Sequence, residues 1–278
     1  MSIGGPSGAG EAPASVPAMA PESPLGPLAD LAREAALAAG TLIRAAGRGV
    51  APEEKATHDY VTAVDRAAEE AIRGVLGRGA PAIPVLGEEG GGPDAAPELW
   101  VVDPLDGTAN FVHGFPAVGV SIALVRDGRP VVGVVHAPFL GETYRAVRGA
   151  GASVEREDGV SPLVVSDRPP SRAIASTGLP FRRRDALPRF LATFERVFGA
   201  IEDIRRPGAA ALDLAWVAAG VFDAYFELGL APWDVAAGGL LVEEAGGRVT
   251  DWSGGDGWVT GEILAGNPAV HAALLGLV

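Results

Sequence analysis

The spacing of hydrophobic residues predicts two helices near the start of the chain. The first covers residues 27–46, and the second, rich in Ala, Glu and Arg, covers residues 62–76. In the first segment, apolar residues recur at intervals that suggest one buried face. The residues expected on that face are Leu28, Leu31, Leu37 and Ile43. The first segment therefore predicts a helix that packs against the core.

Apolar and β-branched runs follow and predict strands. They cover residues 99–102, 118–125, 131–136 and 163–165. Asp127 and Gly128 separate the second run from the third, and this dipeptide favours a tight hairpin turn. The first part of the chain thus predicts helices combined with antiparallel strands.

Helices and strands alternate in the remaining sequence. The pattern predicts helices at 186–198, 209–221 and 235–244, and strands at 224–227 and 248–249. This order indicates a layered α/β architecture in two parts. Ser, Asp and Pro cluster near residues 161–170, so we expect an N-terminal α+β half at 27–165 and a C-terminal α/β half at 166–278. Residues 1–26 are mostly Gly, Pro, Ala and Ser, which is typical of a disordered tail.

Composition narrows the functional classes. Of 278 residues, 48% are hydrophobic and 21% charged, enough apolar surface for a core. Thirty-five acidic against 22 basic residues give a net charge of −13, which disfavours nucleic acid and anionic membranes as partners. The absence of Cys excludes disulfides, thiolate metal sites and cysteine nucleophiles. Without a visible targeting signal or an apolar run of about 20 residues, we expect a cytoplasmic protein.

The sequence Asp-Pro-Leu-Asp-Gly-Thr carries the clearest candidate chemistry. A buried strand leads directly into Asp103, and Asp106 follows after Pro104, which should force a turn. Two carboxylates at a strand end can converge on one hard cation. Gly107 and Thr108 come where a helix could begin, and free backbone N–H groups there, with the Thr hydroxyl, suit an anion. Cation ligands beside an anion cradle suggest a metal-bound phosphate.

These residues also admit a plain structural explanation, in which Asp106 only caps the following helix. Several other polar residues near expected element ends are equally ambiguous when taken alone, because each could be a solvated or capping group. They are Lys55, Asp59, Asp65, Glu88 and Asp234. On the helix predicted at 209–221, Asp213 is expected to be a satisfied or partly buried structural residue.

Taken in order, the motifs resemble those of the inositol monophosphatase family, Mg²⁺-dependent and lithium-sensitive sugar-phosphate phosphatases. The matching motifs are Lys55…Asp59-Tyr-Val-Thr62…Asp65, Gly87-Glu88-Glu89, Asp103-Pro-Leu-Asp106-Gly-Thr108 with Asn110-Phe111, and Trp233-Asp234 before Glu243-Glu-Ala-Gly-Gly247. Four motifs in the family's order are far more specific than any one of them, and the likeness runs from about residue 28 to residue 278. The resemblance implies a layered αβαβα sandwich and a homodimer.

The resemblance also implies metal ligands. Glu88, Asp103 and the carbonyl of Leu105 would hold one Mg²⁺, while Asp103, Asp106 and Asp234 would hold a second, with Asp103 bridging. A third, weaker ion would lie near Glu88. Carboxylate and carbonyl oxygens suit Mg²⁺. Two or three Mg²⁺ ions are therefore expected, with most ligands in the N-terminal half and Asp234 in the C-terminal half.

Catalytic and substrate positions follow from the same resemblance. Thr108 and Asp65 resemble the pair that, with Glu88, orients and deprotonates a metal-bound water, and Gly107 with Thr108 would bind the phosphate. By pattern alone, Glu227 is a strand-end residue that faces solvent. In the family, however, its position contacts substrate hydroxyls. The expected substrate contacts are Asp106, Ala210, Glu227 and Asp234, with Lys55 and Asp59 in supporting positions.

The resemblance therefore implies a Mg²⁺-dependent phosphomonoesterase for a small polyol phosphate, with inositol 1-phosphate as first candidate. Histidinol phosphate, fructose 1,6-bisphosphate and 3′-phosphoadenosine 5′-phosphate are alternatives, because shared motifs define a reaction better than a substrate. Ala109 and Ala209 replace hydroxyl residues of some relatives and leave the preference open. The alternative from another class is a catalytically silent protein that binds a metal or a phosphorylated ligand and regulates a partner. Its expected signature, loss of Glu88, Thr108 or Asp65, is not found.

Overall fold

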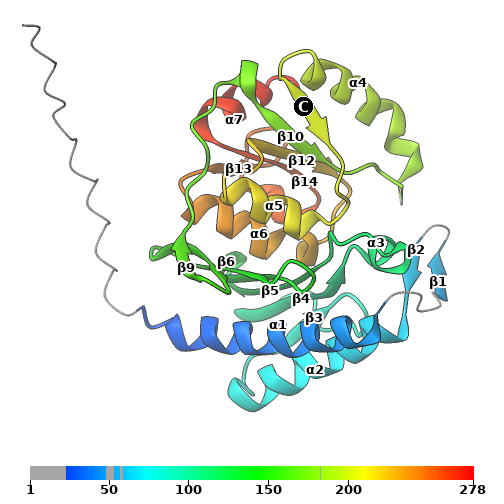
Figure 1. Ribbon diagram of the computed structural model, residues 1–278, viewed down its shortest axis with the longest axis vertical. Coiled ribbons are helices and arrows are strands. Elements are labelled where there is room, and N and C mark those ends of the chain that lie inside the picture. Colours follow the sequence, from blue (N-terminus) through cyan, green and yellow to red (C-terminus); the bar gives the residue numbers. More distant parts are fainter. Residues whose placement is uncertain (1–22, 48–52, 57–58, 182) are drawn as a thin grey trace, which may run out of the picture.

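A computed structural model describes residues 23–47, 53–56, 59–181 and 183–278. Five layers alternate in it: a pair of helices, a seven-stranded sheet, a second pair of helices, a five-stranded sheet and outer helices (Figure 1). This is the αβαβα sandwich that the motifs led us to expect. Within the described ranges, every helix is too short or too polar to cross a membrane.

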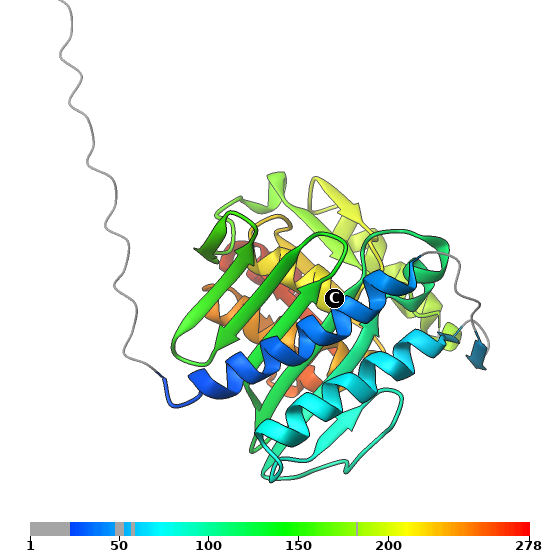
Figure 2. The same cartoon turned by 60° about the horizontal axis from the view of Figure 1, so that its bottom comes forward.

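The first layer consists of α1 (Gly26–Ala46) and α2 (Ala63–Gly79), which lie side by side across the large sheet (Figure 2). The expected leucine face of α1 is wrong. Leu28 and Leu37 are nine positions, or about two and a half turns, apart and so project to opposite sides. Both are only partly buried, and the face against the sheet is made mainly of small residues. They are Ala29, Ala32, Ala35, Ala36, Ala39 and Gly40, with Ile43 at the end.

The large sheet contains the strands of the first half. They are β3 (Val85–Gly87), β4 (Glu98–Asp106), β5 (Gly119–Arg126), β6 (Arg129–Ala137), β7 (Glu142–Val147), β8 (Gly151–Arg156) and β9 (Gly159–Pro162). They pair in chain order, with β3 and β4 parallel and the rest antiparallel. The hairpin expected at Asp127 and Gly128 is confirmed, with φ of 49° and 77°.

The strand expected at residues 163–165 is wrong. The last strand of the large sheet ends at Pro162, and residues 163–169 form an extended connection towards the second sheet. Leu163 still donates to the carbonyl of Ala152, but Val165 donates to the carbonyl of Ala245 beyond the end of a helix. Within this run only Leu163 is buried, while Val164 is exposed and Val165 is partly buried at the crossing between layers.

Two helices fill the space between the sheets, α5 (Ala210–Ala218) and α6 (Pro232–Glu244). Their buried faces contact both sheets, and α6 is apolar on nearly all sides because it is enclosed. The small sheet has the order β11-β10-β12-β14-β13. Its strands are β10 (Ile174–Thr177), β11 (Asp203–Arg205), β12 (Ala224–Leu228), β13 (Arg248–Thr250) and β14 (Glu262–Gly266).

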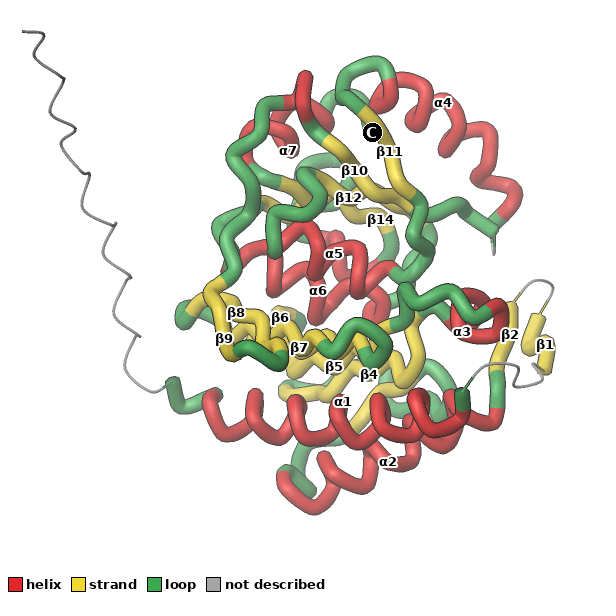
Figure 3. The backbone as a smooth tube through the Cα atoms, in the orientation of Figure 1, coloured by secondary structure: helices red, strands yellow, loops and turns green. Residues whose placement is uncertain are grey.

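The outer layer is formed by α4 (Leu187–Phe198) and α7 (Pro268–Leu274), which pack their apolar residues on the small sheet (Figure 3). A short helix α3 (Thr108–His113) follows β4, and a hairpin of β1 (Glu53–Ala56) and β2 (Asp59–Val61) precedes α2. Three 3₁₀ turns complete the fold at Pro170–Arg172, Arg184–Ala186 and Gly257–Thr260. Of the predicted tail, residues 1–22 lie outside the described residues, while Leu25 is buried against α1 and α2.

Candidate active site

A β-bulge brings the two acidic residues of β4 to one place. Asp103 pairs with Ser121 of β5 and Asp106 pairs with Gly119, so three steps along β4 match two along β5. In a regular strand, positions three apart face opposite sides of the sheet, and one extra residue removes that difference. The turn expected at Pro104 is wrong, since the strand continues to Asp106. Pro104 lies in the bulge, where a missing N–H breaks no ladder.

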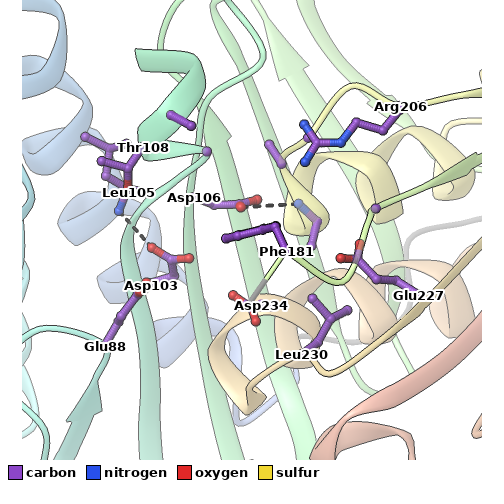
Figure 4. A pocket seen from close by; sticks show the side chains of 16 residues that line it. Glu88, Asp103, Leu105, Asp106, Thr108, Phe181, Arg206, Glu227, Leu230 and Asp234 are labelled. Carbon is purple, nitrogen blue, oxygen red and sulfur yellow. Dashed lines mark hydrogen bonds between the residues drawn. The ribbon is translucent and has the colours of Figure 1, made fainter. Parts of the chain in front are cut away.

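The carboxylates line a cavity of about 100 Å³ to which both halves of the chain contribute (Figure 4). Among the lining residues are Glu88, Asp103, Leu105, Asp106, Gly107, Thr108, Phe181, Arg206, Ala210, Glu227, Leu230 and Asp234. The predicted site residues are thus brought together, except that Asp65 lies behind Thr108. Lys55 and Asp59 are on β1 and β2 of the hairpin.

Asp106 caps a helix, but not the one that follows it. Its Oδ1 accepts the N–H of Ala210 at 3.2 Å and its Oδ2 accepts the N–H of Ala211 at 2.8 Å, both at the start of α5. Burial raises the pKa of Asp106 to about 6, although these N–H groups favour the ionised form. The carboxylate is therefore oriented by the N-terminus of α5.

Asp103 is a deeply buried carboxylate of this group. It is 2% exposed, and its Oδ1 accepts the Leu105 N–H at 2.9 Å. Burial raises its pKa well above the ordinary value, and the negative charges of Glu88, Asp106 and Asp234 raise it further. Several carboxylates that destabilise one another in a buried cavity need a cation or protons for compensation.

The donor set fits a hard divalent cation, because it offers carboxylate oxygens and the carbonyl of Leu105. In the described ranges, no three acidic or imidazole side chains already stand close enough to coordinate one ion as they are. The mutual repulsion of these carboxylates would be offset by a bound cation.

Thr108 and Asp65 form the hydrogen-bonded pair that the motifs predict. Thr108 Oγ1 lies 3.0 Å from Asp65 Oδ1 and 3.1 Å from the carbonyl oxygen of Leu105. Asp65 Oδ2 accepts both the N–H and the hydroxyl of Thr62, at 2.9 and 2.5 Å, and so completes a capping box at the start of α2. One carboxylate therefore anchors a helix and holds the Thr108 hydroxyl.

Gly107 makes the turn from β4 into α3. Its φ of 86° is in the left-handed region, and a Cβ there would lie 2.9 Å from the carbonyl oxygen of Ala117. Asn110, one turn into α3, donates from its amide to the carbonyls of Ala117, Pro207 and Gly208 at 2.8–3.2 Å. The motif residue Asn110 thus ties the phosphate-side loop to the segment before α5.

Glu227 does not face solvent, so the interpretation from its pattern alone is wrong. It lies on β12, is 8% exposed, and accepts a hydrogen bond from the Tyr225 hydroxyl. Burial raises its pKa to about 8, and the charge of Asp234 adds to that effect. Gly178 leaves the necessary space, because a Cβ there would be 2.0 Å from Oε2 of Glu227.

Asp234 sits in the first turn of α6 and accepts the N–H of Ala231 at 2.7 Å through Oδ2. Asp234 therefore does act as a capping group of α6, and it also lines the cavity. The start of α6 is fixed to the large sheet as well, since Ser121 Oγ donates to the carbonyl of Trp233 at 2.8 Å.

Comparison with known proteins identifies the family of the chain. A profile of the Inositol monophosphatase family matches residues 25–278. The chain belongs to this family. The match covers both sheets and every acidic residue of the cavity. The likeness to the family therefore covers the described fold from α1 to the last helix and is not confined to the short motifs.

Some relatives of this family member are named as Nus factors, and others are named as inositol monophosphatases. Nus factor SuhB of Pseudomonas aeruginosa is 45% identical over 260 residues, 90% of this chain and 94% of that protein. The structure of an inositol monophosphatase from Anabaena (Nostoc) is 39% identical, with a TM-score of 0.82 over 92% of this chain and 96% of that one. Inositol monophosphate-bound SaIMPase-II is 30% identical, with a TM-score of 0.74 over 90% and 92%.

Asp213, which we expected to be a satisfied or partly buried structural residue, is buried, and its Oδ1 has no hydrogen-bond partner among the described residues. Two other residues, Arg206 and Glu69, were missed by sequence reasoning. Arg206 lines the cavity, and no local pattern indicated it. Glu69 is buried beneath the loop that carries Glu88. Its position four residues after Asp65 was the available signal, because such residues share a helix face.

Proposed function

We propose that this family member is a Mg²⁺-dependent phosphomonoesterase that acts on a small polyol phosphate, with inositol 1-phosphate as the first candidate. The observation that carries the proposal is one cavity that combines several repelling carboxylates with a hydroxyl–carboxylate pair. A related structure named as inositol monophosphate-bound adds support for the substrate class.

The proposed cation ligands divide between two ions. Glu88, Asp103 and the carbonyl of Leu105 would hold one, and Asp103, Asp106 and Asp234 the other. When bound, Mg²⁺ ions neutralise the phosphate oxygens and lower the pKa of a nucleophilic water. They also reverse the local charge of a chain whose net charge is −13, so that an anionic substrate can enter.

The proposed proton path uses Thr108 and Asp65. Because the Thr108 hydroxyl donates to Asp65 Oδ1, the lone pairs of Oγ1 can accept a hydrogen bond from water. The water proton would then pass to Oγ1 as the hydroxyl proton of Thr108 passes to the Asp65 carboxylate. Asp65 is held by Thr62 and therefore keeps the hydroxyl in one orientation. Glu88 lines the same cavity and would orient the same water. No protein nucleophile is needed in this scheme.

The part of the cavity wall formed by Glu227 and Ala210 would position the polyol. Glu227, held by Tyr225, presents a carboxyl group that can accept from or donate to a substrate hydroxyl. Ala210 forms the adjoining surface at the start of α5 and is small enough to leave room for a ring. The phosphate end would lie near Gly107 and Thr108, where α3 begins.

The test is phosphate release from a panel of esters with Mg²⁺ or with a chelator. The panel contains inositol 1-phosphate, histidinol phosphate, fructose 1,6-bisphosphate and 3′-phosphoadenosine 5′-phosphate. We expect release only with Mg²⁺ and fastest from inositol 1-phosphate. Release that is unaffected by the chelator would contradict the metal assignment, and a different best ester would correct the substrate.

One observation favours a second substrate candidate, a sugar bisphosphate such as fructose 1,6-bisphosphate. Arg206 lines the cavity on the side away from Thr108, and no ion pair within 4.0 Å joins it to another described residue, although its charge partly offsets the raised pKa values of Glu227 and Asp213. A guanidinium in this situation can take up a second phosphate by paired N–H donation. The panel above separates this candidate from inositol 1-phosphate.

The Nus factor name of several relatives favours a candidate from another class, a role through a protein partner that is independent of turnover. It is supported if the protein binds Mg²⁺ but releases phosphate from none of the esters. The expected homodimer and the expected lack of a nucleic-acid partner remain predictions. Light scattering of the purified protein and a gel-shift assay with RNA test them.

A further inference from the structure

One face of α2 carries three ionisable residues at four-residue intervals, Asp65, Glu69 and Arg73. Residues at this spacing lie one above another on a helix. Asp65 contacts Thr108 in the cavity. The other two residues take no part in the proposed chemistry, yet Glu69 is only 3% exposed. A charged residue this deeply buried needs hydrogen-bond partners, and these identify what it does.

Glu69 binds the backbone of the loop that carries Glu88. Its Oε2 accepts the N–H of Glu89 at 2.8 Å, and its Oε1 accepts the N–H of Gly90 at 2.9 Å. Both loop groups immediately follow Glu88 in the chain. The carboxylate therefore holds the turn by its two N–H groups, much as an anion is held.

Arg73 holds the same loop by its carbonyl groups. It donates from Nε to Glu69 Oε1 at 2.7 Å, from Nη1 to the carbonyl of Val85 at 3.1 Å, and from Nη2 to the carbonyl of Gly91 at 2.5 Å. Together the two side chains engage four backbone groups between residues 85 and 91. Such a paired arrangement restricts both ends of the loop at once.

Two glycines of the loop are shaped for this contact. A Cβ at Gly87 would lie 2.5 Å from the carboxyl carbon of Glu69, and one at Gly90 would lie 2.5 Å from its Oε1. The loop closes on itself through mutual hydrogen bonds of 3.1 Å between Gly87 and Gly91. The N–H of Glu88 donates to the carbonyl of Val102, beside Asp103, at 3.1 Å. The backbone of Glu88 is thus fixed from both sides.

We propose that Glu69 and Arg73 are positioning residues, which set the place of Glu88 relative to the Thr108–Asp65 pair and thereby the affinity for the cation. One helix then positions both parts of the proposed water-activating group. Asp65 holds Thr108, and Glu69, one turn further along α2, holds the loop of Glu88. The inference rests on the proposed function in assigning Glu88 to the cation. The contacts between α2 and the loop stand independently of it.

The experiment compares Glu69→Gln with Glu70→Gln. Glu69→Gln keeps the size of the side chain, but the amide has one carbonyl oxygen in place of two carboxylate oxygens. That oxygen can accept from only one of the two loop N–H groups. The NH₂ group would then face a second donor, either the other loop N–H or the Arg73 guanidinium. Glu70 is the adjacent residue of the same type and is exposed on α2. The Mg²⁺ concentration that gives half of the maximal thermal shift measures cation affinity without substrate, and hydrogen exchange of the Glu89 and Gly90 amides measures loop order.

We expect Glu69→Gln to weaken Mg²⁺ binding by about tenfold or more, because partners of metal ligands contribute about 10–100-fold. Exchange of the Glu89 and Gly90 amides should accelerate, and kcat should recover at high Mg²⁺ with KM little changed. Glu70→Gln should match the wild type in each respect. Equal Mg²⁺ affinity in the two variants overturns the proposal, even if Glu69→Gln lowers the melting temperature. A wild type that takes up no Mg²⁺ refutes the proposed function itself and is recognised without either variant.

Discussion

The carboxylate of Asp106 accepts the backbone N–H of Ala211 at 2.8 Å, although 105 positions separate the two residues in the chain. This bond joins the end of β4, in the large sheet, to the start of α5, between the sheets. Because α5 directs its unsatisfied N–H groups at Asp106, the helix stabilises the negative charge there. A residue that we propose as a cation ligand is thus also a contact between two layers.

Replacement of Asp106 by Asn should abolish Mg²⁺-dependent phosphate release while the fold survives. The amide oxygen can still accept the Ala211 N–H, but the charge for a cation is lost. We expect kcat/KM to fall by more than about a hundredfold, since even indirect partners of a metal contribute about 10–100-fold. Phosphate release and circular dichroism measure the two effects. Turnover close to that of the wild type would exclude Asp106 as a ligand.

Stability should depend on pH in a direction set by the buried carboxyl groups. Burial raises the pKa of Asp106 from 3.8 to about 6 and that of Glu227 from 4.5 to about 8. Such groups hold their protons more tightly in the folded state, so the free energy of unfolding falls as pH rises from the unfolded value through the folded one. Cation-free protein should therefore lose stability between about pH 4 and about pH 8.

Mg²⁺ should remove most of this loss, because it binds the ionised carboxylates and replaces their protons. The increase in melting temperature caused by Mg²⁺ should be small near pH 5 and larger near pH 8. Thermal melts with Mg²⁺ or a chelator across this range provide the measurement. An increase of equal size at both ends would show that these carboxylates are not the cation site.

Replacement of Arg206 by Gln should separate the two substrate candidates. If Arg206 binds a second phosphate, kcat/KM for fructose 1,6-bisphosphate should fall by about tenfold or more, as expected for loss of a charged hydrogen bond of about 1.5–3 kcal/mol. Activity on inositol 1-phosphate should change little. Arg205→Gln is the matched control, since Arg205 is paired with Asp203 and does not line the cavity. Equal losses on both esters would assign Arg206 to the general charge balance of the cavity.

Replacement of Gly178 by Ala should disturb Glu227 directly. The new Cβ would overlap the carboxylate, which must move away from Tyr225. Overpacking of this kind costs about 1–3 kcal/mol of stability. We also expect a higher KM for the polyol phosphate, because the displaced carboxyl group no longer faces it. Gly77→Ala is the comparison, because Gly77 lies in α2 with open space around it and should gain stability from Ala. Chemical denaturation of both variants measures the two changes in the free energy of unfolding, which should have opposite signs.

The order of the motifs, more than local chemistry, allowed the cavity residues to be predicted from sequence. Asp103 lies in β4, Glu88 follows β3 and Asp234 lies in the first turn of α6, and each of them alone also admitted a structural explanation. The pairing of Thr108 with Asp65 followed from the motif resemblance, since 43 residues separate them in the chain. The structure brings these residues together, as the motif order predicted, and their chemical roles stay predictions.

The remaining contacts depend on the packing of layers, which local pattern does not encode. The solvent-facing and cavity-facing interpretations of Glu227 have the same strand pattern, and only the position of α6 distinguishes them. The bulge at Pro104 likewise depends on pairing with β5. In α1, the leucines suggested a face that the alanines in fact occupy, because close approach to the sheet favours small side chains. Glu69 resembled an ordinary surface residue of a helix until its loop partners were known.

The cavity is shared between the sheets, and this has a consequence for how the chain acquires activity. All strands of the large sheet lie within residues 85–162, but the cavity also needs Asp234, Glu227 and the α5 N-terminus that orients Asp106. If the large sheet forms first, sheet and helix signals should appear during refolding before any phosphate release. Recovery of turnover would then follow the packing of the two sheets against each other, a later step than the formation of secondary structure.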